Sequence, residues 1–214
     1  MDNVQKNMKT KDKIISKALE MFNESGIEYV GMRELAAALN IRVGNITYYF
    51  PTKDDLVYEL SMALNQLNAK ILSEKTDHSI ETFVLMFRQV FNNHYQFRCL
   101  LLSFVHLMKQ NKRMFQTYQT TQDNRFIIIR TNINTLIREG YLDELNQHEV
   151  AFLVSSITLI VRFWLSEAAI SFNHLNPQEQ IDHYVTMICR QLLPFATAKG
   201  KKKLKQLIKA LKAD

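Results

Sequence analysis

Eight residues between positions 33 and 53 suit contact with nucleic acid: Arg33, Arg42, Val43, Gly44, Asn45, Thr47, Tyr48 and Lys53. Arginine can grip guanine through two hydrogen bonds, asparagine can bond an adenine edge, and valine can touch a thymine methyl group. Hydroxyl groups such as those of Thr47 and Tyr48 bind phosphate oxygens, and glycine lets the backbone come close to a ligand. Lys53 opens a helix, where an anionic phosphate would settle.

Two short helices joined by a sharp turn would bring these residues to one surface. Apolar residues three or four apart define both helices, with Leu35, Ala36 and Leu39 on the first and Ile46, Tyr49 and Phe50 on the second. Asn40 tolerates the left-handed backbone that such a turn requires, and we expect Tyr49 and Phe50 to pack in the small core. The pattern predicts a helix-turn-helix whose second helix enters the major groove of DNA; an ordinary pair of short helices is the alternative.

A helix over residues 11–25 precedes this pair and is expected to support it. Ile14, Ala18 and Phe22 recur every fourth residue and form one apolar stripe. Thr10 is predicted to cap the start of the helix, and Gly26 to end it in a left-handed conformation.

With these features, residues 10–57 resemble the DNA-binding domain of the TetR family of bacterial regulators. The resemblance is carried by the helix with Ile14, Ala18 and Phe22, by residues 33–36, and by residues 41–56, which end in an aromatic cluster, Lys53, two acidic residues and a leucine. It implies that Tyr48 and Lys53 contact phosphates. It also implies an all-α fold of about nine helices, with a larger domain that binds a small molecule and forms a homodimer.

Three residues depart from the family pattern. Arg42 replaces the usual capping Ser or Thr of the second helix, Gly31 replaces a Thr, and Thr47 replaces a Tyr. A cation at a helix start opposes the helix dipole. We interpret this misfit as a sign that Arg42 faces a phosphate or a base, with an accidental surface position as the alternative.

The overall charge gives this prediction no support. The chain has a net charge of +6, and residues 199–214 hold seven lysines against one aspartate, which is the whole excess. The start of the chain lacks the apolar core of a signal peptide, and the two cysteines, Cys99 and Cys189, suit buried thiols in a reducing compartment. We therefore expect a cytoplasmic protein that does not insert stably in a membrane.

Residues 56–198 are predicted to form the second domain, between a DNA-binding domain at 1–55 and a lysine-rich tail at 199–214. Five glycines and three prolines in 214 residues favour long helices, expected at 53–73, 79–95, 97–110, 112–139, 147–172 and 178–195. No catalytic signature or metal-ligand spacing is present, and six histidines are scattered singly. We therefore expect no enzyme activity, cofactor or metal.

The helices of the second domain are rich in aromatic residues. Plain core packing explains most of them, but in this family some would line a cavity for a hydrophobic inducer. The candidate ligand-binding residues are Phe87, Phe91, His94, Phe104, Tyr118 and Phe126. Arg162, in an otherwise apolar helix, needs an acceptor, and Glu167, a carbonyl or an acidic ligand would each serve.

The helix over 147–172 is apolar nearly all round, so it must be covered on both sides. By resemblance, this helix and the one over 178–195 form a four-helix bundle with a second copy. The predicted interface residues are Phe152, Ile160, Trp164, Tyr184 and Ile188.

The tail after Gly200 has an apolar stripe among its lysines. It is predicted to pack on its own dimer as a terminal helix; a membrane-surface or partner-binding helix and a disordered tail are the alternatives.

The sequence thus predicts a homodimer that binds palindromic double-stranded DNA and represses transcription until a hydrophobic molecule releases it. Two alternatives use the same fold: an architectural or cell-division factor, and a ligand- or membrane-binding dimer with a vestigial DNA site.

Overall fold

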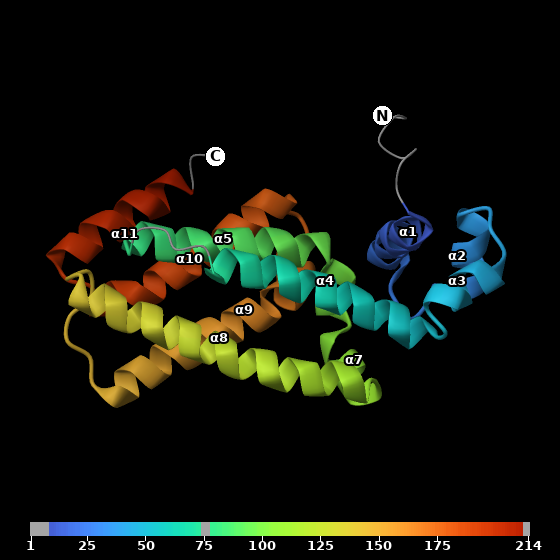
Figure 1. The fold of residues 1–214 in the computed structure, drawn as a ribbon. Coiled ribbons are helices and arrows are strands. Elements are labelled where there is room, and N and C mark those ends of the chain that lie inside the picture. Colours follow the sequence, from blue (N-terminus) through green and yellow to red (C-terminus); the bar gives the residue numbers. More distant parts are fainter. Residues whose placement is uncertain (1–8, 74–77, 212–214) are drawn as a thin grey trace. The chain divides into compact units, whose positions relative to one another are not determined.

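A computed structural model describes residues 9–73 and 78–211 of the chain. The predicted all-α fold is confirmed, because these residues form helices joined by short connections (Figure 1). In order, the helices are α1 (Thr10–Ser25), α2 (Met32–Ala38), α3 (Val43–Tyr49), α4 (Lys53–Ser73), α5 (Ile80–Gln96), α6 (Arg98–Leu102), α7 (Phe104–Gln110), α8 (Lys112–Arg138), α9 (Gln147–Ser171), α10 (Pro177–Leu192), the 3-10 turn η2 (Leu193–Phe195) and α11 (Ala198–Ala210).

Two details of the predicted helices are corrected. The helix expected over 97–110 is interrupted at Ser103, whose φ of −90° and ψ of 11° leave helical geometry and separate α6 from α7. Helix α1 begins at Thr10 itself, with Lys9 at the capping position and no side-chain capping bond. The described residues therefore contain more helices than the nine that the sequence suggested.

The chain divides into two compact units. The first contains Met1–Gln66 and Phe97–Thr117, and the second contains Leu67–Gln96 and Tyr118–Asp214. The division falls inside α4 rather than at residue 55, because Leu56, Val57 and Leu60 of this helix are buried in the core. Helices α6 and α7, expected in the second domain, belong to the first unit.

The core of the first unit is built from one face of each of its N-terminal helices. Ile14, Ala18 and Phe22 of α1 are buried, as are Leu35 of α2 and Ile46 of α3. Contacts join α1 to α2 and α3, and α2 to α3. Each helix thus exposes its opposite face to solvent.

The second unit packs around the indole of Trp164 on α9. The ring centroids of Phe91 and Tyr184 lie 4.9 Å and 5.6 Å from that of Trp164. The indole N–H donates to Nδ1 of His94 at 3.3 Å. Helices α5, α9 and α10 all contact one another, so this aromatic cluster is the centre where they meet.

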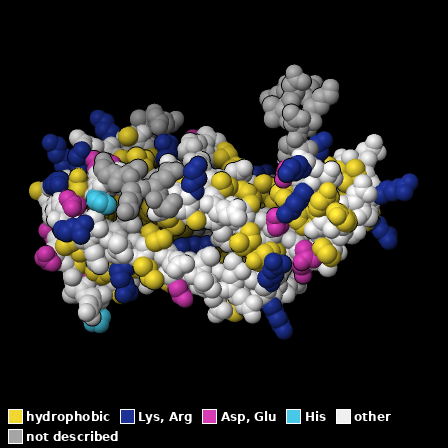
Figure 2. Space-filling view, in the orientation of Figure 1, with side chains coloured by type: hydrophobic (Ala, Val, Ile, Leu, Met, Phe, Trp, Pro, Cys, Tyr) yellow, Lys and Arg dark blue, Asp and Glu magenta, His cyan; other side chains and the backbone are white. Residues whose placement is uncertain are grey.

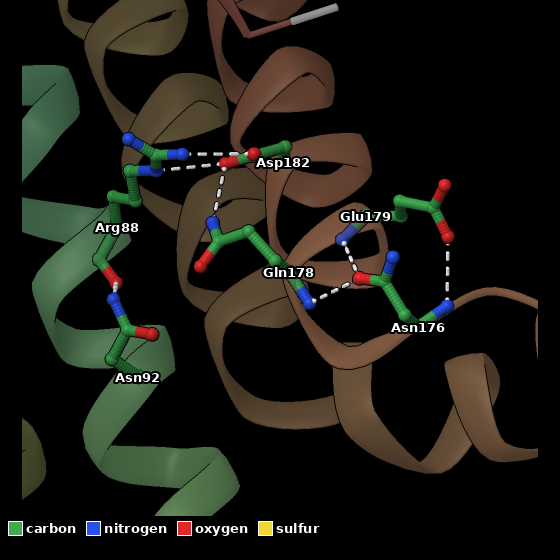
Figure 3. Close-up of polar contacts among 6 residues, drawn as sticks. All are labelled: Arg88, Asn92, Asn176, Gln178, Glu179 and Asp182. Atoms are coloured by element: carbon green, nitrogen blue, oxygen red, sulfur yellow. Dashed lines mark hydrogen bonds and ion pairs between the residues drawn. The ribbon is translucent and has the colours of Figure 1, made fainter. Parts of the chain in front are cut away.

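An ion pair joins α5 to α10 at the edge of this core (Figure 3). Both oxygens of the buried Asp182 carboxylate accept from the Arg88 guanidinium, at 2.8 Å and 2.9 Å. The Gln178 amide donates to the same carboxylate at 3.0 Å. At the start of α10, Asn176 accepts from the backbone N–H groups of Gln178 and Glu179, which is the expected capping of a helix that begins with proline.

Helix α9 is long and apolar enough to cross a membrane by length and composition. The core helix of a soluble protein meets the same criterion. Leu153, Ile157, Leu165 and Ala168 of α9 are buried within the second unit, as is Trp164, so one face of the helix belongs to the protein core.

The lysine-rich tail folds as α11 and docks within its own chain. Leu204 and Leu211 are buried, and α11 contacts α5 and α10. The apolar stripe that a membrane anchor would need is therefore used in packing. Lysines on the other side of α11 stay at the surface, where Figure 2 shows dark blue side chains at this end of the unit.

The break predicted at Gly200 is corrected, because Gly200 lies inside α11. A Cβ atom at this position would stand 2.0 Å from the backbone oxygen of Tyr141. Thr197 caps the helix by accepting from the Gly200 N–H at 3.2 Å, and its hydroxyl donates to the Gly140 carbonyl at 2.8 Å. The glycine therefore permits close contact of α11 with the turn after α8.

Replacing Gly200 by alanine is expected to lower the free energy of unfolding by about 1–3 kcal/mol, because the added methyl group overpacks this contact. The matched control is Gly44→Ala, since a Cβ atom at Gly44 meets nothing within 4 Å. That change should leave stability unchanged or raise it slightly. Urea denaturation measures both, and equal stability of the two variants would contradict the close docking of α11.

Candidate functional site

The turn between α2 and α3 has the left-handed residue that the sequence predicts. Asn40 has a φ of 53°. The N–H of Ile41 donates to the Ala36 carbonyl and the N–H of Asn40 to the Ala37 carbonyl, both at 3.0 Å. These two bonds form a Schellman motif, which ends α2 and turns the chain sharply into α3.

Helix α3 is fixed to the unit through one face. Ile46 is completely buried, and Phe50 directly after the helix is buried as well. Because side chains that follow one another by one or two positions point to different sides of a helix, Asn45 and Tyr48 project away from the core and are exposed. The helix thus presents a polar surface whose orientation is set by its apolar anchors.

The start of α3 is polar and open. Arg42 occupies the capping position with an extended backbone, makes no side-chain capping bond, and is exposed. Gly44 is exposed with open space around it, and Val43 is half-buried. This arrangement leaves the Arg42 guanidinium and the Asn45 amide accessible on one end of the helix.

The tyrosine pair at the end of α3 differs from the prediction. Tyr48 is 80% exposed and Tyr49 is 40% exposed, and their rings meet edge to face at 5.0 Å. Tyr49 therefore supports Tyr48 at the surface rather than packing in the core, while Phe50 is buried as expected. Thr47 is half-buried, and its hydroxyl donates to the Gly44 carbonyl at 3.4 Å.

Lys53 ties the start of α4 to the loop between α1 and α2. Its ammonium donates to the Val30 carbonyl at 3.0 Å and to the Glu28 carbonyl at 3.4 Å. An ammonium has three donors, so one N–H is left for a phosphate. Arg33 lies exposed on α2. The predicted cap of α4 is present, because the Thr52 hydroxyl accepts from the Asp55 N–H at 3.2 Å.

The candidate ligand-binding residues are not brought together as one set. Phe104 belongs to the first unit and the other five to the second. Phe87 and Phe91 are buried in the core, with Phe87 edge to face against Phe83. Tyr118 and Phe126 on α8 are half-buried.

His94 is a core residue with both ring nitrogens engaged. Nδ1 accepts from Trp164, and Nε2 lies 3.4 Å from the Asn68 side-chain amide. Burial, together with the charge of Arg125, lowers the pKa of His94 to about 3. The ring is therefore neutral at physiological pH, and its packing and hydrogen bonds assign it a structural role in place of the predicted ligand contact.

Arg162 lies over the ring of Tyr118, with its guanidinium carbon 5.4 Å from the ring centroid. Glu167, one of the acceptors considered for Arg162, instead accepts a hydrogen bond from the Tyr184 hydroxyl. Arg125 also lies over Tyr118, at 5.6 Å. Sequence reasoning missed Arg125, although its seven-residue spacing from Tyr118 places the two on one face of α8.

The predicted dimer residues are corrected in part. Trp164, Tyr184 and Ile188 are buried within the second unit of the single chain, so their side chains are already covered. Phe152 is 58% exposed and Ile160 is half-buried. Because α9 is apolar on every side, its sequence does not reveal which face points inward.

The two cysteines are buried thiols, as predicted. Burial raises the pKa of both Cys99 and Cys189 to about 12, so neither forms a thiolate at physiological pH. Among the described residues, no group of three or more metal-ligating side chains gathers to hold an ion.

Comparisons with known proteins match both parts of the chain to one family. Residues 14–60 match a family described as bacterial regulatory proteins, tetR family. Residues 63–204 match a family described as TetR, bacterial transcriptional repressor.

Among curated proteins, a probable HTH-type transcriptional regulator, YttP, of Bacillus subtilis (strain 168) is 30% identical over 95 residues. The match covers 41% of this chain and 46% of YttP. The matched segment thus spans about half the length of that relative.

Two solved structures have a similar fold. A TetR-family transcriptional regulator from Marinobacter aquaeolei VT8 has a TM-score of 0.87 at 21% identity, covering 95% of this chain and 99% of that one. A gamma-butyrolactone receptor described as an ArpA-like protein has a TM-score of 0.68 at 12% identity, covering 95% and 96% of the two chains.

Replacing Asn40 by alanine is expected to lower the free energy of unfolding by about 1–2 kcal/mol, because alanine is strained in the left-handed conformation. Asn40→Gly should be close to neutral, since glycine adopts this conformation freely. The control is Asn45→Ala on exposed α3, which should be neutral or slightly stabilising. Denaturation curves compare the variants, and equal losses at positions 40 and 45 would contradict the role of Asn40 in the turn.

Proposed function

Because the chain belongs to the TetR family of bacterial transcriptional regulators, we propose that it is a cytoplasmic, ligand-responsive repressor that binds palindromic DNA as a homodimer. The observation that carries this proposal is the exposure of Arg42 and Asn45 on a helix whose opposite face is buried through Ile46. Such a helix can enter the major groove without disturbing its own core.

Each exposed group of this surface has a chemical part in DNA recognition. The guanidinium of Arg42 and the amide of Asn45 read base edges, and Val43 contacts a thymine methyl group. Tyr48, Thr47 and the remaining N–H of Lys53 bind phosphates and fix the register. Arg33 on α2 adds a further positive charge near the backbone.

A dimer is needed because α3 is short. Its seven residues span roughly 10 Å, enough to read only a few base pairs. Two copies related by a twofold axis place their α3 helices on half-sites about 34–36 Å apart, or a multiple of this spacing. A palindromic operator is the matching DNA sequence.

We assign the dimer contact to the exposed face of α9 with the adjoining part of α10. Phe152 and Leu159 of α9 are 58% and 59% exposed and lie seven residues apart on one face of the helix. Met187 of α10 is also exposed, and a hydrogen bond of 3.2 Å from Ser156 to Gln191 joins the two helices. A second copy would cover these apolar side chains, which a monomer leaves in water.

Replacing Asn45 or Arg42 by alanine is expected to weaken binding to the operator by about 10- to 100-fold and to relax base preference, because each loses a contact to a base edge. Tyr48→Phe should weaken binding to all DNA sequences to a similar degree, since it loses a phosphate contact. Fluorescence anisotropy on DNA from upstream of the gene, at fixed salt, measures both effects.

The matched control for these DNA variants is Arg138→Ala, which removes an exposed arginine of α8 in the second unit. Its affinity for the operator should be unchanged. If the wild-type protein does not prefer any upstream fragment over a scrambled one, the repressor proposal fails. If Asn45→Ala weakens binding to scrambled DNA as much as to the operator, its assigned role is wrong.

Replacing Leu159 by glutamate is expected to convert the dimer into a monomer, because the change places a charge in an apolar interface. The matched control is Ile127→Glu on α8, where the side chain is 62% exposed. Light scattering after size-exclusion chromatography should show a monomer for Leu159→Glu and a dimer for Ile127→Glu. Dimers of both variants would place the interface elsewhere.

A further inference from the structure

Two arginines converge on one tyrosine in the second unit. Arg125 is on the same helix as Tyr118, and Arg162 comes from α9. Their guanidinium carbons lie 5.6 Å and 5.4 Å from the Tyr118 ring centroid. Arg162 also lies 5.9 Å from the ring centroid of Phe163. Both arginines are therefore within cation–π range of the same ring.

The two like charges oppose each other in partly buried surroundings. Burial lowers the pKa of Arg125, and the charge of Arg162 lowers it further. Two cations on one ring gain cation–π attraction but also repel each other, and the repulsion grows as water is excluded. A bound anion between them would turn this repulsion into attraction.

The same unit shows how an arginine with a purely structural part is neutralised. Arg88 meets both oxygens of the buried Asp182 carboxylate, which joins α5 to α10 (Figure 3). Arg162 forms no ion pair within residues 9–73 and 78–211, and its recorded contacts are with Tyr118 and Phe163. Glu167, five residues along α9, is already engaged by Tyr184.

The hydroxyl of Tyr118 adds a donor to the cluster. Burial raises the pKa of Tyr118, so the hydroxyl keeps its proton. When its oxygen accepts from Arg162, that proton remains available for donation to an anion. His94, whose pKa the Arg125 charge helps to lower, stays neutral and does not compete for the anion.

We propose that Arg125, Arg162 and the Tyr118 hydroxyl bind the carboxylate of a small organic anion with an apolar body. The planar guanidinium matches the two oxygens of a carboxylate, and Tyr118, Phe126 and Phe163 offer apolar ring surface for the rest of the molecule. This inference rests on the proposed function in one respect, because it names the class of ligand that the regulator senses.

The test uses two matched pairs of probes on the full-length protein without DNA: 1-naphthoate against 1-naphthamide, and octanoate against octanamide. Each pair differs in charge while keeping the apolar body. Isothermal titration calorimetry at fixed salt is expected to show that at least one carboxylate binds about tenfold or more tightly than its amide. Arg125→Gln and Arg162→Gln should each remove this preference.

Arg130→Gln is the matched control, because Arg130 is an exposed arginine on the same helix, α8. It should keep the full preference for the carboxylate. Arg162→Lys keeps the charge but loses the fork of donors, so it should bind the carboxylate more weakly than wild type and more tightly than Arg162→Gln. This variant also serves if Arg162→Gln does not fold.

The inference is overturned if neither carboxylate is preferred over its amide, or if Arg130→Gln removes the preference as fully as Arg162→Gln does. Because binding is measured without DNA, these results are independent of the operator experiments. Loss of DNA binding with an intact carboxylate preference would instead count against the proposed repressor function alone.

Discussion

Burial of Ile46 and Phe50 fixes the orientation of α3, and what the first unit presents to solvent follows from it. The Schellman turn at Asn40 sets the angle at which α3 leaves α2, and the apolar anchors set its rotation about its own axis. The polar residues of α3 have no freedom to choose another face. Recognition of DNA therefore rests on a small amount of apolar packing, which places charged groups without contacting them.

The second unit treats positive charge in two different ways. Arg88 is matched by the carboxylate of Asp182, and this pair contributes to the joining of two helices. Arg125 and Arg162 instead share the ring of Tyr118, where each increases the electrostatic cost of the other. Functional sites often keep such unfavourable arrangements because a ligand relieves them. The contrast within one helical unit separates a structural arginine from a ligand-binding one.

Several errors of sequence reasoning have one physical origin. The apolar spacing of Tyr49 predicts a core position, but the ring lies partly exposed beside Tyr48. Trp164 was expected in the dimer interface, yet it is the centre of its own unit. In both cases an apolar side chain has more than one surface to cover, and residue type alone does not distinguish them.

The sequence by itself determined the helical class, the left-handed turn at Asn40, the capping of α4 by Thr52 and the burial of the two cysteines. These features depend on periodicity and on the conformational preferences of single residues, which are local. Tertiary structure alone decided which face of α9 is covered, where the units divide within α4, and that Arg125 meets Arg162 on Tyr118. These depend on contacts between residues far apart in the chain, and no local pattern records them.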